Sequence, residues 1–334
     1  MSDMNNLDGH ERDPCARMSR WPLLLVIGLM LLVPPLFIAV NSASAHMFLN
    51  SAEPQCNGSD PTVLMCDDFE DGTWYVTNAD TAGGRSNPLN NGWWGSIYHT
   101  DPLQQSYGRC GQKGAVGTNC TSTSTWRSGG AAQGQAFHLL GPQVVTGYDE
   151  IYHRVYIKFS ADYEFGHEKL IFYQADANNA STQILLINTP FGSPCFDIHA
   201  WKDDIRVAQN QGTPFCFLPG HWHYFEVHLK LNPVGSKTGL VEIWADDCGT
   251  DGLSCTGSGT LRLRVNTLNL RTAAIKCCDF HQENWCPVSG NKPCKGEVYN
   301  DQVVVATRRV GPIRSASGDT TSPAMPTGAK ITVP

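Results

Sequence analysis

The sequence predicts an all-β protein, built as a two-sheet antiparallel jelly-roll sandwich. Three observations carry this prediction. Charged residues make up only 16% of the chain, which is too few for a helical bundle or a coiled coil. The 32 glycines and 20 prolines place turn residues all along the sequence. Between these turns, short segments alternate apolar and polar residues with the period of two that a strand requires.

The predicted strands share this alternation, and each is bounded by Gly, Pro, Asn or Asp. No segment shows the pattern of an amphipathic helix of any length. Strands are expected at residues 151–159, 169–174, 183–188, 195–201, 223–231, 240–246, 261–267 and 298–307. Short strands with turn signals between them are typical of two antiparallel sheets packed face to face.

The first 45 residues have the features of a targeting segment. No charged residue occurs from Trp21 to Val40, and three arginines precede this stretch. Pro34 and Pro35 interrupt it, and the small residues 43–45 fit a cleavage site. Residues 1–45 are therefore predicted to be a signal peptide or a signal anchor. The protein is expected to be secreted, periplasmic or at the cell surface, with a membrane contact only if the segment is retained.

The rest of the chain divides into one domain and a tail. Residues 46–312 contain all the predicted strands and are expected to form the jelly-roll domain with disulfide-held loops. Residues 313–334 are rich in Pro, Ser and Thr, which is typical of a tail without a core of its own.

The cysteines agree with export. Of the 13 cysteines, only Cys15 precedes the apolar segment, so an even dozen follows it and predicts six disulfides. The last four cysteines lie near His281 and leave a zinc site as an alternative to bridges. Proximity in sequence suggests four pairs: Cys56–Cys66, Cys110–Cys120, Cys195–Cys216 and Cys248–Cys255.

Alternation also sorts the side chains of each strand onto two faces. The face that points away from the core mixes aromatic rings with cations and carboxylates, as a glycan-binding sheet does. Outward polar residues on a sheet are often simply solvated, which is the alternative. The outward residues are Tyr152, Arg154, Tyr156 and Lys158 in 151–159, Asp197, His199 and Trp201 in 195–201, and Tyr224, Glu226, His228 and Lys230 in 223–231.

Four segments carry a resemblance to a known group of proteins. They are CDDFEDGTWY, YDEIYHRVYIKFSADYEFG, GHWHYFEVHLKLNPVGSKTGLVEIWADD and YNDQVVVATRRVGPI, which span residues 66–312. They resemble successive signatures of a concanavalin A-like jelly roll, and in particular the heparin-lyase-I and alginate-lyase-like polysaccharide lyases. These segments are mainly scaffold strands and specify the fold better than the chemistry.

The resemblance implies β-elimination at a uronic acid in an acidic polysaccharide. A cation or amide neutralises the carboxylate, a base removes the C5 proton, and an acid protonates the leaving oxygen. We expect Arg154 to neutralise the carboxylate, His199 to act as the base and Tyr156 to act as the acid or as an alternative base. Further substrate contacts are expected from Tyr152, Lys158, Gln174, Trp201 and Glu226.

Two other functions remain open at this point. A jelly roll with the same polar face could bind a polysaccharide or oligosaccharide without cleaving it, because a fold does not determine a function. A glycoside hydrolase needs paired carboxylates on one strand, but in VEIWADD Trp244 stands between Glu242 and Asp246, where the middle acid would be. The net charge of −7 argues against a nucleic-acid partner.

No cofactor is expected for catalysis, but the resemblance implies a structural calcium ion. Its ligands would be Glu70, in the DFEDG segment, and Asp301, near the last strand. The alternative is that these carboxylates belong to a polar turn and to the start of a strand.

Overall fold

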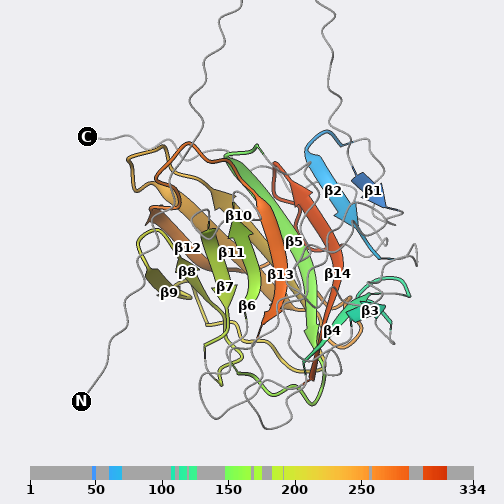
Figure 1. Ribbon diagram of the computed structural model, residues 1–334. Coiled ribbons are helices and arrows are strands. Elements are labelled where there is room, and N and C mark those ends of the chain that lie inside the picture. Colours follow the sequence, from blue (N-terminus) through green and yellow to red (C-terminus); the bar gives the residue numbers. More distant parts are fainter. Residues whose placement is uncertain are drawn as a thin grey trace, which may run out of the picture. The chain divides into compact units, whose positions relative to one another are not determined.

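The computed structural model describes residues 47–49, 60–69, 107–109, 113–118, 120–125, 147–166, 169–174, 183–190, 192–255, 258–285 and 296–313. In this part of the chain the regular elements are strands, which form a nine-stranded and a five-stranded sheet (Figure 1). The predicted targeting segment and most of the predicted tail lie outside the described residues. Within them, we find no helical segment with the length and hydrophobicity that a bilayer span requires.

The nine-stranded sheet contains the longest strands. Its strands pair in the order β1 (Met47–Leu49), β2 (Val63–Asp67), β14 (Gly296–Ala306), β5 (Glu150–Phe159), β10 (Trp222–Lys230), β11 (Gly239–Asp247) and β12 (Leu261–Leu268). Two short strands, β3 (Tyr107–Arg109) and β4 (Thr121–Thr125), join it through the pairing of β4 with β14. The pairs are antiparallel except β1 with β2, which is parallel.

The five-stranded sheet is antiparallel throughout. Its order is β13 (Asp279–Trp285), β6 (Lys169–Gln174), β7 (Gln183–Asn188), β8 (Asp197–Ala200) and β9 (Ile205–Ala208). In Figure 1 this sheet lies in front of the nine-stranded one.

The eight strands expected from alternation are all present, and β6 and β7 have the predicted bounds. β8 is shorter than the expected 195–201, because Cys195 makes only an isolated bridge with Cys216 and Trp201 begins a turn. β9 was not predicted. It has four residues, three of them exposed, so the sequence lacks the apolar alternation that marks a half-buried strand.

One hydrophobic cluster joins the two sheets and makes the structure a sandwich. β5 contributes Ile151, Val155 and Ile157 from the nine-stranded sheet, and β6 contributes Ile171 and Tyr173 from the five-stranded sheet. These side chains alternate along their strands, as a strand with one buried face requires. The residues between them therefore lie on the outer faces, where the candidate site residues are found.

A histidine also lies in this core. His153 is fully buried, and its Nδ1 lies 2.9 Å from the hydroxyl of Tyr173 on the opposite sheet. Burial lowers the pKa of His153 to about 3, because the charged ring would lose its hydration. His153 is therefore a neutral structural residue at physiological pH.

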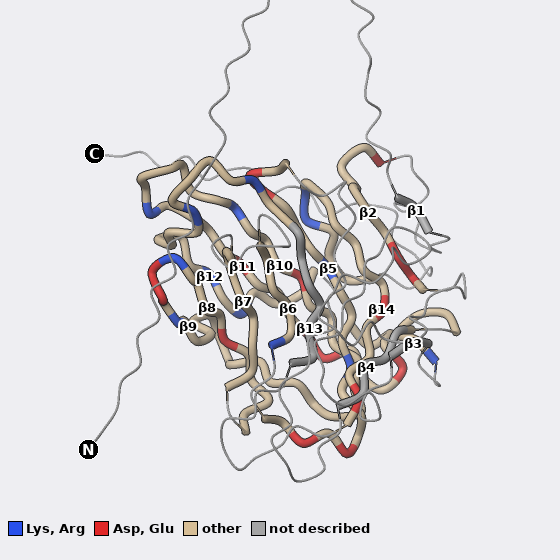
Figure 2. Tube along the Cα trace, viewed as in Figure 1, with Lys and Arg blue, Asp and Glu red and all other residues tan. Residues whose placement is uncertain are grey.

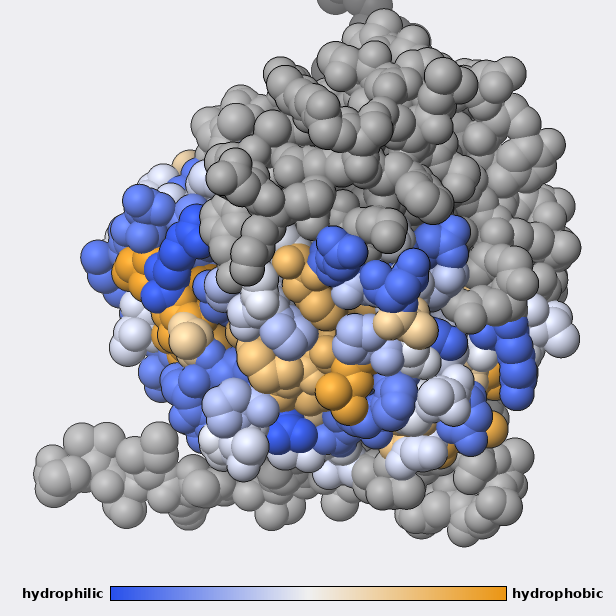
Figure 3. Space-filling model, turned by 90° about the horizontal axis from the view of Figure 1, so that it is seen from below, coloured by the Kyte–Doolittle hydropathy of each residue, from blue (hydrophilic) through white to orange (hydrophobic). Residues whose placement is uncertain are grey.

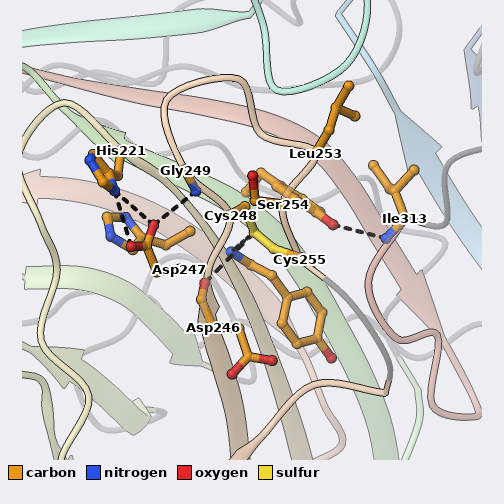
Figure 4. The surroundings of a disulfide bond; sticks show 12 residues. His221, Asp246, Asp247, Cys248, Gly249, Leu253, Ser254, Cys255 and Ile313 are labelled. Carbon is orange, nitrogen blue, oxygen red and sulfur yellow. Dashed lines mark hydrogen bonds and ion pairs between the residues drawn. A yellow bond between two sulfur atoms is a disulfide. The ribbon is translucent and has the colours of Figure 1, made fainter.

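The disulfides confirm two of the predicted pairs, Cys195–Cys216 and Cys248–Cys255, and the second is shown in Figure 4. Cys66 and Cys120 are also disulfide-bonded, and their predicted partners lie outside the described residues. The adjacent Cys277 and Cys278 are bonded to each other. This bridge was not predicted, and it removes two of the four thiolates that the zinc alternative requires.

Candidate functional site

The outer face of the nine-stranded sheet carries most of the residues expected to bind substrate. Arg154, Tyr156 and Glu226 do point away from the core between the sheets, as predicted. All three nevertheless have 0% exposure. The expectation that solvent and substrate reach these side chains is therefore wrong, and the reason is a segment of the chain that lies over them.

We call residues 309–313 the C-terminal strap. The carboxylate of Glu226 accepts hydrogen bonds from the backbone N–H groups of Val310 (2.7 Å) and Gly311 (2.9 Å). The hydroxyl of Tyr156 accepts one from the backbone N–H of Ile313 (2.8 Å). The oxygens of Glu226 and Tyr156 therefore bind the backbone of the strap. The strap occupies the position in which a ligand was expected.

The guanidinium of Arg154 is also committed to the backbone. Its Nε and Nη2 donate to the carbonyl of Gln302 (3.3 and 3.2 Å), and its Nη1 donates to that of Gly311 (3.4 Å). Arg309 of the strap lies over the ring of Trp244, 4.2 Å from its centroid. The strap is therefore held by hydrogen bonds and by a cation–π contact, and the guanidinium of Arg154 binds the backbone carbonyls of Gln302 and Gly311.

The remaining predicted residues of this face are half-buried. The ring of Tyr152 stacks on His228, with centroids 4.1 Å apart and planes at 8°. Burial, together with the negative charges of Glu150 and Glu242, raises the pKa of Tyr152 to about 12, so this phenol is a poor base. Lys158 lies over the ring of Trp222 at 5.6 Å.

The carboxylates considered for a hydrolase are engaged in ion pairs on the same sheet. Glu242 Oε2 lies 2.7 Å from His228 Nδ1, and Asp246 Oδ1 lies 3.2 Å from Arg262 Nη2. His228 Nε2 lies 2.8 Å from Glu150 Oε1. These contacts link β5, β10, β11 and β12, and they give the carboxylates a structural role.

The outer face of the five-stranded sheet is different, because there the polar groups cluster around a histidine. In β8, Ile198 and Ala200 belong to the core cluster, so Asp197 and His199 point outward. In β9, Val207 packs on the core, and Arg206 lies opposite His199 in the register of the two strands. This face therefore brings an acid, an imidazole and a guanidinium together. Figure 2 shows acidic and basic residues interspersed along the chain in this region.

His199 is bound by a carboxylate from the turn that joins β8 to β9. Its Nε2 lies 2.6 Å from Oδ1 of Asp204, whose own side chain is 88% exposed. Asp204 has a positive φ of 51°, a conformation that Asp tolerates better than most residues. Its backbone N–H donates to the carbonyl of Trp201 and closes the turn. The second ring nitrogen of His199, Nδ1, has no hydrogen-bond partner among the described residues.

Aromatic rings border His199. Trp201 lies 4.4 Å from it by ring centroids, and Phe172 of β6 meets Trp201 edge-on at 6.2 Å. The indole Nε1 of Trp201 is buried, and no residue in the described ranges accepts its proton. Gln174, two residues after Phe172 on β6, lies on the same face and is buried.

Asp197 stands next to this group. It lies opposite Asn188 of β7 in the register of the two strands. Burial raises the pKa of Asp197 above its ordinary value, although the charges of Arg206 and His199 work in the opposite direction. This carboxyl group therefore keeps its proton to a higher pH than an exposed aspartate does.

The structure thus divides the predicted site into two groups on opposite sides of the core. His199, Gln174 and Trp201 share the outer face of the five-stranded sheet. Arg154, Tyr156, Tyr152, Lys158 and Glu226 lie on the nine-stranded sheet. Sequence reasoning missed Asp197, Asp204 and Arg206 as site residues. Asp197 had a signal, since it shares the alternation of His199, whereas Asp204 and Arg206 belong to a turn and an exposed strand without such a pattern.

The predicted calcium ligands can be examined only in part. Glu70 lies outside the described residues. Asp301 is fully buried, and its carboxylate accepts hydrogen bonds from the backbone N–H groups of Ala115 (2.8 Å), Val116 (3.2 Å) and Gln302 (2.8 Å). These donors satisfy both oxygens without a metal, and the calcium site stays a prediction.

The face of the molecule seen in Figure 3 shows apolar residues bordered by hydrophilic side chains. The large apolar side chains classed as exposed in the described ranges are Ile205, Leu218, Val234 and Leu253. They come from separate segments, and such scattered residues are normal for a protein surface.

The chain was also compared with known proteins. No protein-family model and no curated protein sequence matches it. Among solved structures, the PL-14 alginate lyase of Aplysia kurodai is 14% identical, with a TM-score of 0.49 and coverage of 71% of this chain and 99% of that chain. The endo-β-1,4-glucuronan lyase of the fungus Trichoderma reesei is 16% identical, with a TM-score of 0.46 and coverage of 70% and 100%. The cellulose-induced protein Cip1 is 18% identical, with a TM-score of 0.46 and coverage of 74% of this chain and 98% of that chain.

At these identities and TM-scores the likeness concerns the fold alone. The two sheets, in which every pair but β1 with β2 is antiparallel, and the absence of helices from the described residues bear out the predicted all-β fold class. The chain is therefore an all-β protein whose described strands form a two-sheet sandwich, as the sequence predicted.

Proposed function

We propose that the protein is a polysaccharide lyase that cleaves a uronate-containing glycan by β-elimination at the outer face of the five-stranded sheet. The observation that carries this proposal is the pair formed by His199 and Asp204, with 2.6 Å between Nε2 and Oδ1. A histidine held in this way by a carboxylate, with its other nitrogen unbonded among the described residues, is suited to general base catalysis.

The tautomer of His199 follows from its partner. The carboxylate of Asp204 accepts a hydrogen bond, so the proton of the neutral ring lies on Nε2 and the lone pair lies on Nδ1. Nδ1 would remove the C5 proton of the uronate. Asp204 would then stabilise the imidazolium that forms.

Arg206 would neutralise the uronate carboxylate. It is exposed and lies opposite His199 in the register of β8 and β9. A guanidinium can bind a carboxylate through two parallel hydrogen bonds, which makes the adjacent C5 proton more acidic. Arg206 takes this role in place of Arg154, whose donors bind the carbonyls of Gln302 and Gly311.

Trp201 and Gln174 would contact the sugar. An indole ring offers an apolar face to a sugar ring, and the buried Nε1 of Trp201 lacks an acceptor among the described residues. The partner would be an acidic polysaccharide or oligosaccharide. The disulfides agree with a protein that works outside the reducing cytosol, where such polymers are met.

The test is to incubate the purified full chain with alginates, glucuronans and glycosaminoglycans and to follow the ultraviolet absorbance of unsaturated products. We expect cleavage of at least one polymer by the wild-type protein and its loss in His199→Ala. The matched control is His221→Ala, because His221 also pairs with a carboxylate, that of Asp247 at 2.9 Å, but on the other sheet. Equal activity in His199→Ala and His221→Ala would refute the proposed base.

Non-catalytic glycan binding is the second candidate function. The aromatic contacts of Trp201 with His199 and Phe172 favour it, because such a surface can bind sugar without any proton transfer. Binding of a glycan in calorimetry without any unsaturated product, together with loss of that binding in Trp201→Ala, would support the binding module instead of the lyase.

A further inference from the structure

The site described above contains a base but has no assigned acid. The sequence assigned that role to Tyr156, but Tyr156 lies on the other sheet, where its hydroxyl accepts the hydrogen bond of Ile313. Tyr173 of β6 points into the core toward His153. Neither phenol can therefore reach a substrate that contacts His199.

Asp197 lies on the same strand and on the same face as His199. Two residues along a strand correspond to roughly 6.6 Å between Cα atoms. A base at C5 and an acid at the neighbouring glycosidic oxygen must approach two adjacent positions of one sugar ring. Side chains at positions i and i+2 of one strand are suited to this spacing.

The surroundings of Asp197 suit a proton donor. One carboxyl oxygen, Oδ1, is buried and has no hydrogen-bond partner within the described part of the chain. Asn188 lies opposite Asp197 on β7, and the positive charge of Arg206 is close enough to act on the carboxyl group. Burial raises the pKa of Asp197, so the protonated form persists to a higher pH than in an exposed aspartate.

A purely structural role for Asp197 is the alternative. It lies opposite Asn188 across the β7–β8 pair, and a half-buried carboxyl group in this position can serve packing alone. If Asp197 had only this structural role, replacing its carboxyl group by the amide of the same shape in Asp197→Asn would leave the rate of elimination unchanged.

We propose that Asp197 is the catalytic acid that protonates the leaving oxygen, an inference that rests on the proposed lyase function. His199 takes the C5 proton, and the electron pair of the C5–H bond forms the C4–C5 double bond. The bond from C4 to the glycosidic oxygen breaks, and this oxygen takes the proton of Asp197. The products are an unsaturated uronate and a new hydroxyl on the neighbouring sugar, so no co-reactant is needed.

The test compares two leaving groups in Asp197→Asn. In a polymer the leaving group is the neighbouring sugar, whose oxyanion is poorly stabilised and needs the acid. In a uronate with a nitrophenyl group at O4 the leaving group is a nitrophenolate, which is stable without protonation. We expect Asp197→Asn to lower kcat/KM on the polymer by about 10²- to 10⁴-fold and to change it much less on the nitrophenyl substrate. His199→Ala should lose activity on both, and the exposed-loop variant Asp251→Asn should lose neither.

The outcomes separate the two proposals. If the wild-type protein eliminates neither substrate, the lyase function fails and the role of Asp197 fails with it. If the wild-type protein is active and Asp197→Asn loses the same factor on both substrates, or nothing on either, the inference about Asp197 alone is overturned. Thermal melting of Asp197→Asn shows whether a common loss reflects unfolding, and Asp197→Glu, which keeps a proton donor, should recover part of the polymer activity.

Discussion

Asp204 binds the imidazole of His199 from the turn after β8, with 2.6 Å between Oδ1 and Nε2. The ring is nearly buried and the carboxylate side chain is largely exposed. The positive φ of Asp204 and its backbone bond to Trp201 hold this turn in shape. The pair therefore orients a ring nitrogen on a face that also carries Asp197 and Arg206.

Replacing Asp204 should remove the preference of the neutral His199 ring for the tautomer with its proton on Nε2. In Asp204→Asn the side chain can donate as well as accept, so the ring is no longer held with its proton on Nε2. We expect the nitrogen chemical shifts of His199 in NMR spectra to report a mixture of tautomers, and kcat/KM to fall by about a hundredfold. Asp247→Asn, beside His221, is the matched control and should leave both quantities unchanged. An unchanged Nε2–H tautomer in Asp204→Asn would contradict this role.

The C-terminal strap should depend on Glu226. An amide at this position would present N–H groups to the backbone donors of Val310 and Gly311, which now bind the carboxylate. We expect Glu226→Gln to lower the free energy of unfolding by about 2–4 kcal/mol, measured in urea. Trypsin should also cleave after Arg309 faster than in the wild type. Resistance to trypsin equal to that of the wild type would show that Glu226 does not hold the strap.

Tyr156→Phe separates the structural role of Tyr156 from a catalytic one. The change removes the acceptor for the backbone N–H of Ile313. It should cost about 0.5–1.5 kcal/mol of stability and leave glycan cleavage intact. Loss of cleavage in a folded Tyr156→Phe protein would instead support the catalytic role, as acid or base, that the sequence suggested for Tyr156.

Two buried histidines should make the protein sensitive to acid. Burial lowers the pKa of His153 to about 3 and that of His223 to about 4, below the ordinary value of 6.5. Below pH 6.5 the unfolded chain binds protons that the folded chain excludes, so stability falls as the pH drops from 6.5 toward 4. The loss is about 1.4 kcal/mol per pH unit for each histidine.

Urea unfolding at a series of pH values checks this prediction. The double variant His153→Gln with His223→Gln should show a smaller fall in stability between pH 6.5 and pH 4 than the wild type. Tyr173→Phe removes the hydroxyl beside His153 but keeps both histidines. Its free energy of unfolding should therefore depend on pH as that of the wild type does. A double variant with the wild-type slope would assign the acid sensitivity to other groups.

The disulfide that closes the longer loop should stabilise the protein more. Cys195 and Cys216 are 21 positions apart in the sequence, and Cys248 and Cys255 are 7 positions apart. Loop-closure entropy predicts losses of about 3.4 and about 2.5 kcal/mol when the pairs are replaced by serine. Denaturant unfolding of the two double-serine variants measures the order. The reverse order would mean that native packing around the sulfurs outweighs the entropy of the unfolded chain.

The strands with clear alternation could be predicted from the sequence. β6 and β7 have their predicted bounds, and the inward and outward positions of β5 and β8 agree with the core cluster. The reason is local, because a strand with one buried face shows its period in the order of its residues. The disulfides of Cys195 with Cys216 and of Cys248 with Cys255 were equally local, since each closes a short loop.

The candidate site depended on contacts between segments that are distant in sequence. Alternation places Arg154 and His199 on outward faces, but it does not say which sheet each strand joins or what covers it. Pairing put β5 and β8 in different sheets, and residues 309–313 came to lie over Arg154 some 150 positions away, as the bond to Gly311 shows. Asp204 is only five positions from His199, but it reaches the ring through a turn with positive φ, and such a turn leaves no periodic signal in a sequence.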